Sequence, residues 1–325
     1  MSASSPSIRR IRVNKHWLSD NILPIAYGVA LIGLSIGVEN FFSPGNFIGL
    51  LVSVAQIGMV ACTMMFCLAS RDFDLSIGST VALTGVVAAM VLQATGSILP
   101  GMAAGLGAGA LIGAGNGVLI AHLKINALIA TLATMLIVRG LAFIVSDGQA
   151  VGIADEGFIA LGGNVYFGLP APAWAAALCF VVFGFLLNYT VFGRNTLAIG
   201  GNAEAARLAG IRVERLRVSI FLLQGVVAAL AGLILASRIT SGQPNAAQGF
   251  ELDVISACVL GGVSLQGGKA RIFGVLIGVL IMGTVENVMN LLNVDAFYQY
   301  LVRGVILLLA VLLDQFKARL GGTPD

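Results

Sequence analysis

Charge is scarce in this chain. Asp, Glu, Lys and Arg make up 10% of the 325 residues, whereas 58% are hydrophobic. Soluble globular domains carry about 25% charged residues, and the mean hydropathy here is +0.97. The composition therefore predicts an integral membrane protein, long enough for on the order of ten helical spans. The basic residues are spread along the flanks of apolar runs and form no single patch, so no nucleic-acid partner is expected.

Residues for redox, metal and nucleotide chemistry are also few. The four cysteines lie in apolar segments without any CxxC pair, so we interpret them as small hydrophobic residues. The two histidines are isolated and form no metal pair. The sequence contains no GxxxxGK(S/T) loop, GxSxG elbow or HExxH helix. We expect no catalytic residue, no metal and no cofactor bound by this chain, so ATP hydrolysis, if it drives the protein, belongs to a separate chain.

Apolar runs separated by polar residues predict an all-α membrane protein of about ten transmembrane helices. The eighth run is short and interrupted by glycine, so the sequence supports at least eight spans and favours ten. These spans form one transmembrane domain, residues 21–316, between a cytoplasmic amino-terminal tail, 1–20, and a cytoplasmic carboxy-terminal tail, 317–325. The predicted spans are 22–38, 47–69, 75–94, 101–121, 125–145, 171–189, 218–237, 253–267, 272–291 and 297–314.

Basic residues favour one set of loops. With the amino terminus inside, only Arg139, Arg238 and Arg303 fall outside the cytoplasmic segments. This positive-inside bias predicts that both termini are cytoplasmic. Seven acidic residues then face outward: Glu39, Asp147, Asp155, Glu156, Glu251, Asp253 and Asp295.

Small residues suggest an internal repeat. A glycine occurs every four residues from Gly101 to Gly117 in the fourth span, and Gly274 and Gly278 repeat this spacing in the ninth. Arg-Gly pairs follow in the fifth and tenth spans. Two five-helix halves of opposite orientation would explain this arrangement, which is found in many transporters. The alternative is that glycine is simply common in membrane helices.

The longest polar interruption between the spans is the loop 191–217. Asn202 is placed to cap a short helix over 203–209, and Gly210 suits the left-handed position that ends it. Glu204 in the first turn and Arg207 in the last both complement the helix dipole. A helix this short is unstable alone in water. It is either ordinary loop packing or a segment shaped for a partner's groove.

Polar residues inside the membrane are candidates for a substrate path, because each is costly there. Glu286, Asn290 and Asn293 have the spacing of one helix face, with Asn287 beside them. They could line a path, or pair with Arg139 or Arg303 between helices.

Two further segments are candidates for a gate. Asp72, Asp74 and Ser76 lie where the second span meets the third, where a plain helix start with Asp72 or Asp74 as a cap is the alternative. Glycines dominate 261–268, and a broken helix near the pathway or a cytoplasmic turn would each suit them. The candidate residues there are Gly261, Gly262, Ser264 and Gln266.

Several motifs together resemble one transporter family. Glu204-Ala205-Ala206-x-x-x-Gly210 matches the EAA-x-x-x-G core of ABC importer permeases. Along nearly its whole length the chain resembles the ribose, arabinose and galactose permeases of the branched-chain amino-acid and sugar importer family. The segments that carry this resemblance are DLSIG from Asp74, LAIGGNAEAA from Leu197 and VLGGVSL from Val259. Those closest to the L-arabinose members are FCLASRDFDLS from Phe66, LKINALIATLATMLIVRG from Leu123, SRITSGQP from Ser237 and GTVENVMNLLN from Gly283.

The resemblance implies a homodimeric sugar permease in the bacterial inner membrane. A cytoplasmic ATP-binding subunit would drive it through the helix 203–209, and a periplasmic sugar-binding protein would deliver the substrate, L-arabinose. Two alternatives remain open. The chain could import a related sugar such as ribose, galactose or another pentose, or it could be an ion-coupled secondary transporter with Glu286 as the ion site.

Overall fold

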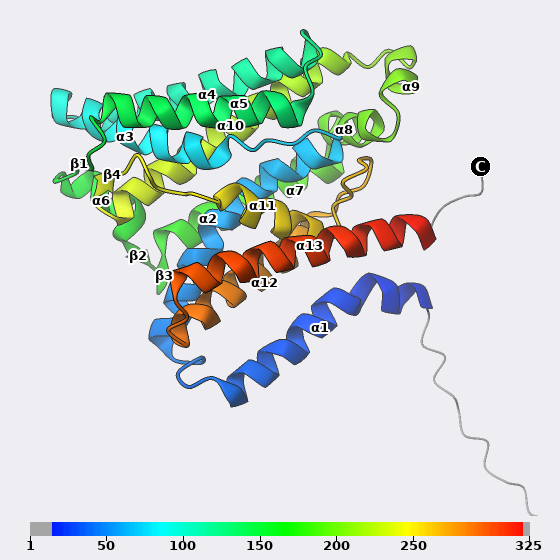
Figure 1. The fold of residues 1–325 in the computed structure, drawn as a ribbon, viewed down its shortest axis with the longest axis horizontal. Coiled ribbons are helices and arrows are strands. Elements are labelled where there is room, and N and C mark those ends of the chain that lie inside the picture. Colours follow the sequence, from blue (N-terminus) through cyan, green and yellow to red (C-terminus); the bar gives the residue numbers. More distant parts are fainter. Residues whose placement is uncertain (1–14, 321–325) are drawn as a thin grey trace, which may run out of the picture.

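The computed structural model describes residues 15–320 and is almost entirely helical (Figure 1). Residues 1–14 and 321–325, which include most of the two predicted tails, lie outside the described residues. The helices of the described range are α1 (Lys15–Gly37), α2 (Pro44–Ala69), α3 (Ile77–Thr95), α4 (Ile98–Ala121), α5 (Ala127–Val145), α6 (Glu156–Gly163), α7 (Ala171–Tyr189), α8 (Val191–Gly201), α9 (Ala203–Leu208), α10 (Val213–Arg238), α11 (Phe250–Leu260), α12 (Ile272–Leu291) and α13 (Ala296–Leu320). The strands have two residues each: β1 (Val151–Gly152) pairs with β4 (Ser241–Gly242), and β2 (Val165–Tyr166) with β3 (Leu169–Pro170), both antiparallel.

Seven helices in the described part of the chain are long and apolar enough to cross a membrane: α2, α3, α4, α5, α7, α10 and α12. The eighth predicted span, 253–267, differs from its prediction. Its helical part, α11, has 11 residues and rises about 16 Å, roughly half of a bilayer's hydrocarbon core. The glycines after Leu260 form a turn, because Gly262, Gly267 and Gly268 all have positive φ. The sequence predicted one span here because the apolar residues of α11 continue into the glycine-rich turn without a polar interruption.

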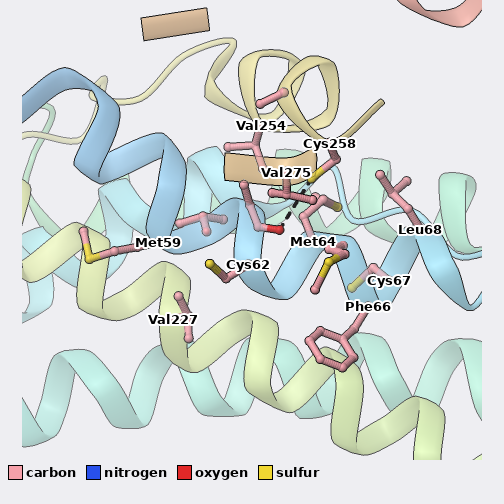
Figure 2. Packing of buried hydrophobic residues seen from close by; sticks show 14 of the residues in the cluster. Met59, Cys62, Met64, Phe66, Cys67, Leu68, Val227, Val254, Cys258 and Val275 are labelled. Carbon is pink, nitrogen blue, oxygen red and sulfur yellow. Dashed lines mark hydrogen bonds between the residues drawn. The ribbon is translucent and has the colours of Figure 1, made fainter. Parts of the chain in front are cut away.

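The core is organised around α2. Every residue from Ile57 to Ala69 of α2 is buried, and the most apolar parts of α2 and α3 are both 72% buried, against 22% in α5. Helix α2 is therefore central and α5 peripheral. Figure 2 shows Cys62 of α2 between Val227 of α10 and Val254 of α11, with Met59 and Phe66 of α2 in the same buried cluster. All four cysteines are buried and free, as expected for small hydrophobic residues.

The glycine stripes let neighbouring helices approach closely. The stripe of α4 faces α3 at Gly101 and α10 farther along, where a Cβ on Gly109 or Gly113 would overlap backbone atoms of Gly225 and Phe221. The stripe of α12 faces α11 in the same way, with Gly278 against the backbone of Ala257. Each stripe is therefore a helix–helix contact surface, as small residues in membrane helices predict.

The two ends of the molecule differ (Figure 1). The start of α1 and the end of α13 lie at the same end as α8 and α9, on the right of the view. All four strands and α6 lie at the opposite end. The segments predicted to be cytoplasmic therefore gather at one end, called here the α9 end, and the large loops predicted to be external gather at the other, the strand end.

Candidate functional site

The short helix of the polar loop forms as expected. The Asn202 side chain accepts hydrogen bonds from the backbone N–H groups of Glu204 and Ala205, both at 3.0 Å, and α9 ends before Gly210, whose φ is +88°. The helix spans Ala203–Leu208, one residue shorter than predicted. An additional helix, α8, precedes it and was not predicted. The polar loop is therefore a pair of helices leading into α10.

Most of α9 points away from the protein. Ala206 is buried, whereas Glu204 and Ala205 are exposed and the Leu208 side chain is 82% exposed. Arg207 is held by two carboxylates, Glu204 at 3.0 Å and Glu214 at the start of α10. The hydrogen bond to Glu214 raises the pKa of Arg207 above its ordinary value. The first pair lies within α9 and the second connects α9 with α10, while the Leu208 side chain and the Glu204 carboxylate remain exposed.

Several segments distant in sequence meet beside α9. A cavity of about 700 Å³ there is lined by basic residues from four of them: Arg71, Lys124, Arg207 and Arg217. The glycine turn after α11 joins the same region, because the Gly268 N–H donates to the Ala69 carbonyl at 2.9 Å and Arg71 Nε donates to the Gln266 carbonyl. The α9 end is thus a connected, positively charged surface.

The segment between α2 and α3 is extended and largely buried. Asp74, 2% exposed, accepts hydrogen bonds from the Ser76 N–H at 2.9 Å and the Ser76 hydroxyl at 2.6 Å. Ser76 is the residue at the N-cap, and its side chain makes no capping bond to α3. Neither aspartate is therefore the cap that the sequence suggested. The two hydrogen bonds from Ser76 to Asp74 instead hold the extended segment that leads into α3.

Asp72 makes a different connection. Its carboxylate lies 3.0 Å from Nε of Arg217 on α10, and the Asp72 side chain is 6% exposed. Arg217 belongs to the second turn of the helix that follows α9. This ion pair links the polar loop directly to the extended segment before α3.

A polar chain across three helices was not predicted. Asn116 of α4, 1% exposed, donates to Ser76 Oγ at 2.9 Å and accepts from the Thr134 hydroxyl of α5 at 2.7 Å. A lone asparagine inside a glycine-rich apolar run was the only sequence signal for it.

The glycine turn contains the remaining gate candidates. Gly261 packs against the backbone of Gly274, and Gly262 adopts a φ of +83° that favours glycine. Ser264 Oγ accepts from the Gln266 N–H at 3.2 Å. The sequence left a broken helix and a turn open, and the structure contains both, since a half-length helix is followed by a turn at the α9 end.

The start of α11 mirrors the start of α3. Residues 73–79 read FDLSIGS and residues 250–256 read FELDVIS, a similarity that sequence reasoning missed. An irregular segment precedes each helix, and a Cβ on Gly78 would overlap the Ala247 carbonyl and the Glu251 carboxylate. From this meeting point α11 runs to the turn at the α9 end, whereas α3 runs to the strand end, where Gln93 binds the Gly152 carbonyl at 2.7 Å. The starts of α3 and α11 thus meet inside the protein, and the two helices run from there in opposite directions.

A cavity of about 320 Å³ lies beside this meeting point. Arg303 of α13 crosses it, with Nη1 3.0 Å from Asp253 of α11 and Nη2 3.6 Å from Glu286 of α12. Asp253 was expected to face outward, but it is 5% exposed, because α11 begins inside the protein. The sequence left two roles open for Glu286, lining a path or pairing with an arginine. In the structure Glu286 both lines the cavity and lies 3.6 Å from Arg303.

The three asparagines near Glu286 do not line this cavity. Asn287 exchanges two side-chain hydrogen bonds with Asn46 of α2, at 2.7 and 3.0 Å. Asn290 accepts from Gln299 at 3.1 Å. Asn293 lies beyond the end of α12 in a turn with φ of +52°. The predicted single stripe is therefore wrong at Asn293, because α12 ends at Leu291. Of the four residues, Glu286 alone is among those that line the cavity.

The loop beside the cavity at the strand end is tied to α5. Arg139 donates from Nη1 to the carbonyls of Pro244 and Ala246, at 2.8 and 2.7 Å. Among the residues that the structure describes, no group of three His, Cys, Asp or Glu is placed to hold a metal ion.

Comparison with known proteins decides the family. Residues 46–311 match the family described as the permease component of the branched-chain amino acid transport system. The chain belongs to this permease family. It is a multi-pass membrane permease, the membrane component of a transport system with several subunits.

The permease has curated relatives with named substrates. It is 59% identical over 295 residues to the L-arabinose transport system permease protein AraH of Escherichia coli K12, covering 91% of this chain and 90% of the relative. It is 57% identical over 284 residues to the L-arabinose ABC transporter permease protein AraH of Azospirillum brasilense, covering 87% and 84%. The ribose import permease protein RbsC of Bacillus subtilis 168 is 45% identical over 293 residues, covering 89% and 91%. No solved structure matches the chain.

Proposed function

We propose that this permease is the membrane-spanning subunit of an ATP-driven, binding-protein-dependent importer of L-arabinose. The assignment of L-arabinose as the substrate rests on sequence identity. The chain is 59% and 57% identical to two L-arabinose permeases and 45% identical to the ribose permease of Bacillus subtilis. The chain itself performs no catalysis and binds no cofactor in this proposal. ATP is hydrolysed by a separate cytoplasmic subunit, and no nucleic acid is involved.

Helix α9 is the element that receives the ATPase subunit. Its six residues are too few to be stable without packing, yet only Ala206 is buried, with Ala203 partly buried against the core. The docking residues are Asn202 and Gly210, which set the helix ends, and Glu204, Ala205, Ala206 and Arg207 within it. Leu208, 82% exposed, supplies an apolar contact of the kind that anchors a helix in a groove. Closure of the ATPase subunits would then move α9 and the helices joined to it.

The architecture is ten membrane segments in two inverted five-segment halves. The similarity of FDLSIGS and FELDVIS supports this, because each marks a break before a helix and the two helices run in opposite directions. Such discontinuous helices meet near the substrate site in many transporters. We further propose that the permease pairs with a second copy of itself in the bacterial inner membrane, with both termini cytoplasmic.

In this architecture the polar residues have roles in the substrate path and in the gate. Glu286 belongs to the substrate path, and Asn287, Asn290 and Asn293 hold the helices and turn around it. Asp74 and Ser76 belong to the break before α3, and Gly261, Gly262, Ser264 and Gln266 belong to the turn that follows α11. In this proposal both segments are moving parts of the gate. A periplasmic sugar-binding protein delivers its ligand at the strand end.

Uptake in intact cells tests this proposal. Cells with the complete complex should accumulate labelled L-arabinose, and unlabelled L-arabinose should compete more strongly than ribose or galactose. A protonophore should not stop uptake while cellular ATP is maintained. Stronger competition by ribose would reassign the substrate to the related sugar, and collapse of uptake with the proton gradient would favour an ion-coupled mechanism through Glu286.

A further inference from the structure

The cavity beside the α3–α11 meeting point contains polar groups without partners. Among the residues that the structure describes, Asp253 Oδ1 and Gln56 Nε2 are buried and have no hydrogen-bond partner. Asp253 is 5% exposed, and both residues line the cavity. A buried polar group without a partner costs about 1–3 kcal/mol. Such groups in the wall of a cavity indicate a ligand that supplies the missing bonds.

The charges around the cavity balance. Its ionisable lining residues are two acids, Asp253 and Glu286, and two bases, Arg238 and Arg303. Their formal charges sum to zero. In a medium of low dielectric constant a net charge in the wall would select an ion of the opposite sign. A balanced wall instead suits a neutral ligand with many hydroxyl groups.

The chemistry of the wall also matches such a ligand. The carboxylate of Asp253 accepts hydrogen bonds, whereas the amide nitrogen of Gln56 donates them. Ser53 lies one turn from Gln56 on α2 and can do either. A sugar hydroxyl both donates and accepts. The volume, about 320 Å³, is at the lower end of the range for small-molecule sites, roughly 300–1,000 Å³.

The cavity is placed to receive a ligand from the strand end. Arg238 and Gln248 are lining residues that are also exposed, so the cavity reaches the surface. They come from the last residue of α10 and the loop after β4, both at the strand end. Toward the α9 end the wall continues into the tightly packed core around α2.

We propose that this cavity is a transient monosaccharide site within the permease. Asp253 and Gln56 contact the sugar directly, and the Arg303 guanidinium bridges the carboxylates of Asp253 and Glu286 beside it. The site rests on the proposed function for its ligand, because L-arabinose is the sugar that the transport proposal names. It adds a sugar-contacting step between the binding protein and the gate.

Protection of a cysteine from modification tests the site without any transport step. Ser53→Cys is introduced into the full-length permease in lipid nanodiscs, where the four native cysteines are buried. A membrane-impermeant thiosulfonate should modify Cys at this position, and L-arabinose should slow the reaction whereas leucine should not. Gln56→Leu or Asp253→Asn in the same background should raise the L-arabinose concentration for half protection about tenfold, the size expected from losing one buried hydrogen bond.

Thr63→Val is the matched control. It removes a buried hydroxyl from the same helix, where Thr63 bonds the Val60 carbonyl and does not line the cavity, so protection should be unchanged. The site is contradicted if the Ser53→Cys protein is not modified, if leucine protects as well as L-arabinose, or if Gln56→Leu and Asp253→Asn shift protection no more than Thr63→Val. Because the assay uses neither ATP nor uptake, its failure leaves the transport proposal standing. Normal protection with no ATP-driven uptake would contradict only the transport proposal.

Discussion

At the scale of single residues, one ion pair connects the polar loop at the α9 end to the extended segment before α3. Arg217 lies just after the polar loop, and Asp72 precedes the break before α3, with 3.0 Å between Nε and Oδ2. The Asp72 side chain is 6% exposed and that of Arg217 is 25% exposed. We expect this ion pair to transmit a displacement of α9 and the start of α10 to the extended segment 70–76.

Removal of either partner should destabilise the permease. Asp72→Ala leaves Arg217 partly buried without its counter-charge, and breaking a buried pair costs about 3–5 kcal/mol. We expect a lower thermal unfolding temperature in detergent, measured by size-exclusion chromatography after heating. The reversed pair, Asp72→Arg with Arg217→Asp, should recover part of the lost stability and of uptake. If the double variant is no better than the sum of the two single charge reversals, the pair does not couple these segments.

Single residues also show which parts of the site were visible in the sequence. Glu286 was found because a carboxylate inside an apolar run is rare. Asp253 was expected outside, because the sequence gives no sign that α11 begins in the protein interior. Gln56 and Asn116 were missed since uncharged amides barely change hydropathy. Their importance depends on which side chains the fold brings opposite them.

Among the elements, α9 was predictable and α11 was not. The signals for α9 are local: an asparagine that caps its first turn, and Gly210, which ends it. The break before α11 depends on tertiary contacts, because irregular backbone at membrane depth survives only where protein surrounds it. The helix α8 was missed because its mixture of polar residues, apolar residues and glycines is typical of a loop.

The coupling assignment of α9 has a direct test in variants. Glu204→Lys reverses an outward-facing charge, and Gly210→Val places a β-branched residue at a φ of +88°. Both should abolish ATP-driven uptake while the permease still inserts in the membrane. Leu208→Asp should reduce co-purification of the ATPase subunit. Phe167→Asp is the control, since Phe167 is 96% exposed at the strand end, and it should leave co-purification unchanged.

Two results would contradict this assignment. Normal uptake by well-expressed Glu204→Lys and Gly210→Val variants would show that α9 is an ordinary connecting helix. Equal loss of the ATPase subunit in Leu208→Asp and Phe167→Asp would show that the effect arises from general destabilisation.

At the scale of the whole molecule, the separation of two ends agrees with the distribution of basic residues. Arg71, Lys124 and Arg207 converge at the α9 end although they come from three different loops. The sequence predicted this convergence because alternate loops of a multi-pass protein share one side. It did not predict that α3 and α11 both begin inside the protein and meet there, because that meeting depends on how the two helices pack against each other.

Cysteine labelling tests the orientation of these ends. Leu208→Cys and Phe167→Cys place exposed thiols at opposite ends of a protein whose native cysteines are all buried. In intact spheroplasts a membrane-impermeant maleimide should label Phe167→Cys, whereas Leu208→Cys should react only after the membrane is opened. The reverse pattern would place α9 outside, away from cellular ATP.

The most direct test of the proposed importer is sided reconstitution. The permease, its ATPase subunit and its binding protein are placed in proteoliposomes in which labelled L-arabinose is supplied from outside with the binding protein, and ATP is enclosed with α9 facing the lumen. Accumulation of L-arabinose that requires both lumenal ATP and the binding protein is the predicted result. Accumulation that continues without ATP and follows an imposed proton or sodium gradient would contradict it.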